Sequence, residues 1–155
     1  MQKKESKGLD LGCGIGNITY PLSYLGYKMV GIDISETNIK IAKSKSFKGL
    51  NPQFFVGNAE NLDLNNIFDF CICSEVLEHL NQPQKVLNTL NHLLKDNGII
   101  IVTIPNGYGP YSLCHDHFRN KIISKLLPIG KSDHLKYFSY NLYNKFIKKN
   151  KFQNY

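Results

Sequence analysis

The densest group of residues with ligand-binding chemistry lies near the N-terminus, where residues 9–17 read LDLGCGIGN. An apolar segment here contains an acidic residue, Asp10, and runs into three alternating glycines. Glycine reaches backbone conformations that other residues avoid, and it lets a ligand contact bare backbone. Asp33 follows about one strand-helix unit later, and its carboxylate can accept hydrogen bonds from both hydroxyls of a ribose. These residues together predict a site for an adenosine-containing cofactor.

The spacing of the glycines distinguishes between two classes of adenosine cofactor. A dinucleotide-binding turn has the pattern G-x-G-x-x-G, which would require glycine at position 17, where this chain has Asn17. The third glycine is instead Gly16, so the pattern is G-x-G-x-G with Asp10 just ahead of it. The turn therefore argues against a nicotinamide dinucleotide.

Three later segments extend the pattern beyond the glycine turn. They read FVGNAENL at residues 55–62, FDFCICSEVLEHL at residues 68–80 and LLKDNGIIIVTIP at residues 93–105. Together with the turn and Asp33, they resemble in order and spacing the class I S-adenosylmethionine-dependent methyltransferases, over about two-thirds of the chain. Within that family the sequence is most similar to the small-molecule branch that includes the quinone-biosynthesis O-methyltransferases.

The resemblance implies a set of cofactor-binding residues. In the family, the acidic residue matching Asp10 and the glycine backbone hold the amino-acid part of S-adenosylmethionine, and the residue matching Asp33 binds its ribose. Asn58 and Ala59 match positions beside the adenine. Asn58 replaces a frequent aspartate, but its amide oxygen can still accept from the adenine amino group. The expected cofactor-binding residues are Asp10, Gly12, Cys13, Gly14, Gly16, Asp33, Ile34, Asn58, Ala59 and Glu75.

Glu75, Glu78 and His79 form a second group with chemical potential. If residues 74–80 begin a helix, the three side chains share one face and converge beside the cofactor. Such a group would suit a hard divalent ion, and in the quinone O-methyltransferases that this segment resembles, the matching Glu-x-x-Glu-His carries magnesium. Alternatively, His79 alone is a general base or a structural residue. We take His79 as the candidate catalytic residue, keep magnesium as an alternative and assign no metal ligand.

Segments with strand character alternate with segments of helical spacing, which predicts an α/β fold with a mainly parallel sheet and helices on both faces. The resemblance implies the same Rossmann-like, doubly wound architecture. We expect Gly26 to end the first helix, Ser35 to cap the second, Pro83 to begin the third and Gly98 to end it. The expected strands are residues 6–11, 29–34, 53–56, 68–73 and 99–104.

Residues 1–155 are expected to form a single methyltransferase domain, with a cofactor-binding core at 1–105 and a basic, substrate-side segment at 106–155. In the family, the closing pair of strands would start where this chain reaches Tyr155. We therefore expect the closing strands to be missing or truncated. The loop at 106–110 follows the last expected strand and is expected to contact the substrate.

The charge of the chain is concentrated in its last segment. Residues 1–114 hold ten Lys and ten Asp or Glu, whereas residues 115–155 hold nine Lys or Arg and two Asp, which accounts for the net charge of +7. A basic surface suits nucleic acid, an anionic membrane or an acidic substrate, although a solvated lysine-rich surface has the same composition. The apolar stripe from Phe118 to Leu127, with lysines beside it, either packs onto the domain or rests on a membrane surface.

Composition places the chain among cytoplasmic proteins. No apolar run approaches the roughly 20 residues that span a membrane, and the short charged start, Met1 to Lys7, does not resemble a secretory signal. The four cysteines are too few for a disulfide framework in a chain of this length, so reduced thiols are expected. We therefore expect a cytoplasmic protein, peripheral to a membrane where the stripe binds one.

The expected function is S-adenosylmethionine-dependent O-methylation of a small-molecule, lipid-linked or glycan-linked acceptor. A nucleic-acid methyltransferase is one alternative, favoured by the basic segment. Enzymes that methylate base amino groups, however, have an Asn- or Asp-Pro-Pro-aromatic turn after the fourth strand, and residues 74–77 read SEVL. Nucleic acid is therefore not the expected partner. The other alternative is a non-catalytic S-adenosylmethionine-binding partner module, which missing closing strands would allow.

Overall fold

The computed structural model describes residues 6–45, 47, 49–65 and 67–104. Almost all of them belong to one compact unit, Met1–Thr103, and a second unit comprises Ile104–Tyr155. The loop at 106–110 and the apolar stripe from Phe118 to Leu127 therefore lie outside the described residues. No helix in the described part of the chain is long and apolar enough to cross a membrane.

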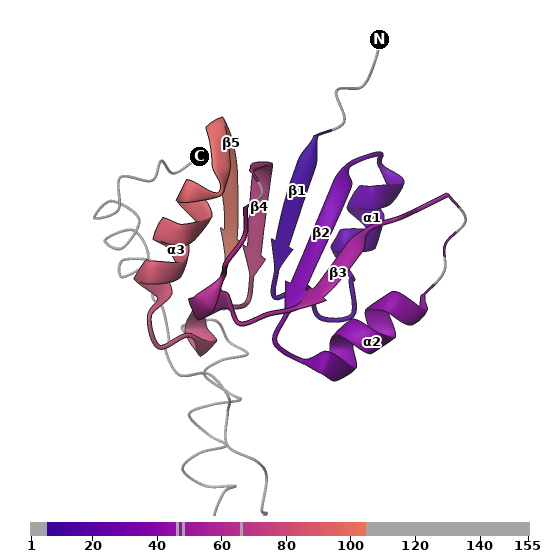
Figure 1. Ribbon diagram of the computed structural model, residues 1–155, viewed down its shortest axis with the longest axis horizontal. Helices are drawn as coiled ribbons and strands as arrows, with labels where there is room; N and C mark the ends of the chain where they lie inside the picture. Colours follow the sequence, from indigo (N-terminus) through magenta and orange to yellow (C-terminus); the bar gives the residue numbers. More distant parts are fainter. Residues whose placement is uncertain (1–5, 46, 48, 66, 105–155) are drawn as a thin grey trace, which may run out of the picture. The chain divides into compact units, whose positions relative to one another are not determined.

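Strands and helices alternate along the described residues, as Figure 1 shows. The first half contains β1 (Lys7–Leu11), α1 (Thr19–Tyr24), β2 (Lys28–Asp33), α2 (Glu36–Ser44) and β3 (Gln53–Val56). The second half contains the short helix η1 (Ala59–Asn61), β4 (Phe68–Ser74), the short helix η2 (Leu77–His79), α3 (Pro83–His92) and β5 (Leu94–Thr103).

The strands form one five-stranded sheet in the order β3-β2-β1-β4-β5, and all four pairings are parallel (Figure 1). The chain moves from β1 toward one edge and from β4 toward the other. Because parallel connections are right-handed, α1 and α2 lie on one face of the sheet and α3 on the opposite face. The prediction of a parallel α/β sheet with helices on both faces is therefore confirmed, and the sheet formed by the described residues is not closed into a barrel.

The core is centred on β1 and its two neighbours. Residues that pair between parallel strands share a face of the sheet, so Leu9 lies between Val30 and Cys71 in one buried row. Successive residues alternate between faces, which turns Asp10 toward α1 on the other side. The centre of the sheet therefore combines an apolar face with a buried acidic side chain just before the glycine turn.

Local signals correctly predicted several element boundaries. Ser35 precedes α2, and its hydroxyl oxygen accepts a hydrogen bond from the Asn38 backbone N–H at 3.2 Å. Gly26 ends the α1 turn with a φ of 93°, and Pro83 begins α3. These boundaries depend on side chains close in sequence, which is why their prediction succeeds.

The expected end of α3 at Gly98 is wrong. The helix ends at His92, and β5 begins at Leu94. The Phe68 N–H donates to the Leu93 carbonyl at 2.8 Å, and Phe68 pairs with Leu94 before the register shifts to Phe70 and Ile99. Pairing with β4 therefore recruits the residues after Leu93 into the sheet, a tertiary effect that helical spacing could not indicate.

Candidate functional site

The glycine turn joins β1 to α1. Gly12 and Gly14 have φ values of 74° and 52°, in the left-handed region that favours glycine. A Cβ at Gly12 would overlap Val76 in the loop after β4, whereas a Cβ at Gly14 would meet no atom within 4 Å. The N–H groups of Gly12 and Cys13 both donate to the Ile32 carbonyl, at 2.7 and 3.0 Å. The turn is thus fastened to β2, and Gly14 faces open space in which a ligand could contact the backbone.

Asp33, the last residue of β2, is joined directly to this turn. Its Oδ2 accepts from the Gly14 N–H at 2.8 Å, and its Oδ1 accepts from the Ser35 N–H at 2.9 Å and from Asn38 Nδ2 at 3.4 Å. A carboxylate has about four lone-pair sites, so it can still accept from a ribose. The next residue, Ile34, is 69% exposed. The structure therefore brings the predicted ribose-binding residue to the predicted glycine turn.

Asp10 lies on β1 beneath the turn. It is 1% exposed and accepts a hydrogen bond from the Thr19 hydroxyl at 2.6 Å. Burial is the main cause that raises the pKa of the Asp10 carboxyl above its ordinary value; the hydrogen bonds from Thr19 oppose the rise, and the charge of Asp33 adds to it. Its negative charge is therefore disfavoured in the absence of a cationic neighbour.

Cys13 occupies the turn with its side chain directed inward. The thiol is buried, and its Sγ lies 3.6 Å from the Gly14 carbonyl oxygen. A Cβ at Gly31 on β2 would approach the same sulfur to 2.9 Å, so Gly31 leaves room for the thiol. Burial raises the pKa of Cys13 to about 12. The Cys13 side chain thus fills the core, and only its backbone belongs to the turn.

The expected adenine-side residues follow β3. Asn58 precedes η1, and its Oδ1 accepts from the Glu60 N–H at 2.9 Å. The Gly57 N–H donates to the Asp33 carbonyl at 2.9 Å, which joins this loop to the end of β2. Asn58 and the half-buried Ala59 therefore lie next in the chain to a residue bonded to Asp33. Their contact with adenine stays a prediction.

Glu75 follows β4 in an unusual backbone conformation, with a φ of 55°. Its backbone N–H donates to the Thr103 carbonyl at 3.0 Å, and its Oε1 accepts from the Thr103 hydroxyl at 3.0 Å. The Ser74 and Thr103 hydroxyl oxygens lie 2.7 Å apart. A small polar group of Ser74, Glu75 and Thr103 thus lies at the carboxyl ends of β4 and β5, with Glu75 and Thr103 exposed and Ser74 half-buried.

Residues 74–80 do not form the helix that would place Glu75, Glu78 and His79 on one face. Ser74 still belongs to β4, Glu75 adopts the left-handed conformation, and only the three residues of η2 are helical. Glu78 is fully buried, whereas the His79 side chain is 40% exposed, with 3.9 Å between His79 Nε2 and Glu78 Oε1. Leu77 and Leu80 are buried together with Glu78, whereas Glu75 is exposed.

This arrangement does not suit the magnesium alternative. Across the described ranges, no group of three or more His, Cys, Asp or Glu side chains could hold a metal ion. The shared helical face on which that alternative depended does not exist. The role of His79 as a proton acceptor stays a prediction.

Two residues that shape the site were missed from the sequence. Thr19 supplies the hydrogen bond to buried Asp10, and Thr103 supports Glu75. Each is an ordinary threonine at the end of an element, at a sequence separation of 9 and 28 residues from its partner. No local pattern marks them, because Thr19 depends on the packing of α1 against β1 and Thr103 depends on the pairing of β5 with β4.

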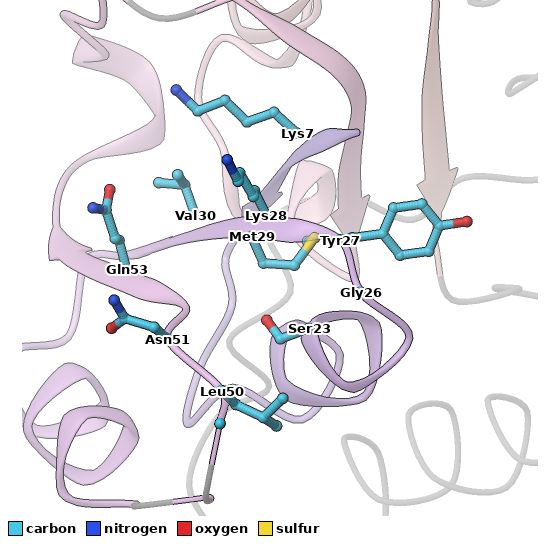
Figure 2. A pocket seen from close by; sticks show the side chains of 11 residues that line it. Lys7, Ser23, Gly26, Tyr27, Lys28, Met29, Val30, Leu50, Asn51 and Gln53 are labelled. Atoms are coloured by element: carbon cyan, nitrogen blue, oxygen red, sulfur yellow. The ribbon is translucent and has the colours of Figure 1, made fainter. Parts of the chain in front are cut away.

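A sizeable cavity of about 500 Å³ lies at the amino ends of the strands, at the opposite end of the sheet from the glycine turn (Figure 2). Lys7, Lys28 and Gln53, from the amino ends of β1, β2 and β3, line it together with residues such as Ser23 from the end of α1. Ligands of open parallel sheets bind at the carboxyl ends of the strands. This cavity is therefore not the cofactor site.

A parallel sheet with a glycine turn after β1 and an acidic residue at the end of β2 defines a Rossmann-like nucleoside-binding domain. Residues 9–102 match the family described as "Methyltransferase domain". This match covers more than half of the chain, and the chain belongs to that family.

Curated relatives and solved structures agree with the family. Ubiquinone biosynthesis O-methyltransferase of Pelagibacter ubique is 36% identical over 132 residues, covering 84% of this chain and 54% of that protein. The protein of the same name from Rickettsia canadensis is 37% identical over 100 residues, covering 63% of this chain and 42% of that protein. The chain spans about half the length of the curated relatives that it matches.

A solved S-adenosylmethionine-dependent methyltransferase from Clostridium acetobutylicum has a similar fold. The two structures superpose with a TM-score of 0.63 and 26% sequence identity, covering 72% of this chain and 46% of that chain. The parallel sheet and the glycine turn described above therefore belong to a known methyltransferase architecture.

Proposed function

We propose that the protein binds S-adenosylmethionine and transfers its methyl group to an oxygen of a small-molecule acceptor. The observation that carries this proposal is the open space over Gly14 together with the Asp33 carboxylate, held 2.8 Å from the Gly14 nitrogen. Bare backbone beside a fixed carboxylate fits a ligand that carries a ribose. Asp10 supports the same conclusion, because a cationic ligand group would stabilise the charge that burial disfavours.

The cofactor, when bound, supplies an electrophilic methyl group on a sulfonium. The residues of this chain then have to orient the acceptor, exclude water and remove a hydroxyl proton. The polar group of Ser74, Glu75 and Thr103 could position a polar acceptor, because it lies at the carboxyl ends of β4 and β5 with Glu75 and Thr103 exposed. We assign His79 as the proton acceptor, since its side chain is 40% exposed near the same loop. Magnesium is not part of this proposal.

The class of acceptor is proposed on two grounds. The oxygen acceptor is supported by the relatives named as ubiquinone biosynthesis O-methyltransferases. A lipid-linked or glycan-linked acceptor, handled at a membrane surface, is supported by the predicted apolar stripe from Phe118 to Leu127 and its lysines. We further propose that the protein acts in the cytoplasm, where cysteines such as Cys71 and Cys73 remain thiols.

Methyl-labelled S-adenosylmethionine tests this function. The full chain is incubated with label and with lipid, glycan, small-molecule and nucleic-acid fractions of a cell extract, and the Asp33→Ala variant is the control. Label that enters the lipid, glycan or small-molecule fraction in an alkali-stable ether, and only with the unmodified chain, supports O-methylation. Cofactor binding without transfer to any fraction would favour the non-catalytic module instead.

A nucleic-acid acceptor is the second candidate, because residues 115–155 hold nine Lys or Arg and two Asp. We expect only weak, non-specific RNA binding, whose affinity falls by about 0.7 to 0.9 log units per phosphate contact for each log unit of salt. Filter binding at a series of salt concentrations measures this slope. Sequence-dependent RNA methylation that resists salt would instead favour a nucleic-acid methyltransferase over the proposed O-methyltransferase.

A further inference from the structure

Lys45 connects the end of α2 to the glycine turn. It directly follows α2, and its ammonium Nζ donates to the Ile15 carbonyl oxygen at 2.7 Å across 30 residues of sequence. Ile15 lies between Gly14 and Gly16 in the turn. A hydrogen bond from a charged donor is stronger than one between neutral groups. The lysine is therefore placed to restrain the backbone that the cofactor site depends on.

Tyr20 of α1 fixes the position of Lys45. Its hydroxyl oxygen lies 2.7 Å from the Ala42 carbonyl oxygen and 2.9 Å from the Lys45 carbonyl oxygen, so the hydroxyl can donate to either at the end of α2. The Lys45 ammonium lies 6.0 Å from the centre of the Tyr20 ring. A Cβ at Gly16 would come within 2.9 Å of that ring. Tyr20 thus contacts both the glycine turn and the residue that restrains it.

The two sides of the turn are held by different groups. Its inner side is fastened by the backbone bonds to Ile32 and by the bond from Gly14 to Asp33. Its outer side, at the Ile15 carbonyl, is held by Lys45. Glycine loses more conformational freedom on ordering than any other residue. A turn that is already ordered in the free protein therefore lowers the conformational-entropy cost of ligand binding.

We propose that Lys45 is a positioning residue for the cofactor site, which holds the glycine turn in its binding conformation before the ligand arrives. Tyr20 keeps the lysine in place. The inference rests on the proposed function for the identity of the ligand. It assigns to the end of α2 a role that the glycine motif itself does not contain.

Lys43 provides a matched control. It carries the same charge two positions earlier, in the last turn of α2, and it is exposed. Within the part of the chain that the structure describes, Lys43 makes no hydrogen bond to the turn. Lys43→Met therefore removes a neighbouring lysine without removing the contact from Lys45 to Ile15.

Isothermal titration of the full chain with S-adenosylhomocysteine compares three variants. We expect Lys45→Met to weaken binding about tenfold or more, the loss of one charge-assisted hydrogen bond. Lys45→Arg should retain affinity within about threefold, because arginine also donates from a charged group, and Lys43→Met should match the unmodified chain. Equal affinity of Lys45→Met and Lys43→Met would overturn the proposal. A lower melting temperature of Lys45→Met with unchanged affinity would show a structural role alone and would also overturn it.

Hydrogen exchange of the free protein separates this inference from the proposed function. Without ligand, the Gly16 amide, which donates to the Cys13 carbonyl at 2.9 Å, should exchange faster in Lys45→Met than in Lys43→Met. If the unmodified chain does not bind S-adenosylhomocysteine, the proposed function fails, and the exchange rates still decide whether Lys45 orders the turn. Equal exchange in the two variants would contradict its role.

Discussion

Asp33 has both observed structural contacts and a proposed role in ligand binding. It accepts hydrogen bonds from the Gly14 and Ser35 backbone N–H groups, and it stands where a ribose is expected. A residue that both shapes a turn and contacts the ligand should be sensitive to substitution, because its loss removes an acceptor and releases the backbone. Asp33 is therefore the most informative single position in the site.

Replacing Asp33 with alanine should weaken binding of S-adenosylhomocysteine by about 1 to 3 kcal/mol, since a charged acceptor and the Gly14 anchor are lost together. Asp96→Ala, at an exposed position in β5, is the control. Isothermal titration measures both affinities. Equal binding by the two variants would show that Asp33 does not contact the ligand.

We expect the buried charge of Asp10 to lower the stability of the free protein and to favour binding of a cationic ligand. Burial raises the pKa of its carboxyl, so the folded state binds the proton more tightly than the unfolded state. The cost of the charge is therefore present at neutral pH and disappears as the pH falls through the raised pKa. Asp10→Asn keeps an acceptor for the Thr19 hydroxyl and removes the charge.

We expect Asp10→Asn to be at least as stable as the unmodified chain at pH 7 and to lose that relative advantage toward pH 4. Its affinity for S-adenosylmethionine should fall, because the cationic ligand loses a charged neighbour. Urea unfolding at both pH values and titration with the cofactor check these outcomes. An unmodified chain that is clearly more stable than the variant at pH 7 would contradict the account.

Among the elements, the sequence predicts best where the determining residues are close together. The cap at Ser35, the stop at Gly26 and the start of α3 at Pro83 all rest on local chemistry, and all are confirmed. The glycine turn and Asp33 are likewise brought together, since consecutive parallel strands end at one edge of the sheet.

The errors lie where distant contacts decide the backbone. The loop after β4 turns at Glu75 because Thr103 of β5 binds it, and β5 begins early because β4 recruits Leu94. Neither contact leaves a periodic pattern in the sequence. For the same reason the sequence does not predict the contact between Lys45 and Ile15, which depends on how α2 packs against the turn.

Strand β4 carries two buried thiols, and their burial predicts low reactivity. Burial raises the pKa values of Cys71 and Cys73 to about 12, and Cys13 in the turn is shifted to about the same value. These three groups should stay protonated and unreactive toward iodoacetamide at pH 8, and they should react after unfolding in urea. Cys114→Ser removes the cysteine that lies outside the described residues. Rapid modification of Cys71 or Cys73 in the native protein, read by mass spectrometry, would contradict their placement.

Across the whole described unit, the carboxyl ends and the amino ends of the strands carry different kinds of side chains. The glycine turn, Asp33 and the polar group of Ser74, Glu75 and Thr103 lie at the carboxyl ends of the strands. The cavity of Figure 2, which Lys7 and Lys28 help to line, lies at the amino ends of the strands. The fold thus separates the residues predicted to bind the nucleoside from that cavity.

The central claim is that this chain binds a sulfonium nucleoside and not a dinucleotide. Isothermal titration of the full chain with S-adenosylmethionine, S-adenosylhomocysteine and NAD tests it most directly. We expect saturable binding of the first two, because Gly14 is open beside Asp33, and negligible binding of NAD, because Asn17 replaces the glycine of the dinucleotide pattern. Tight binding of NAD with no response to either sulfur-containing ligand would contradict the account.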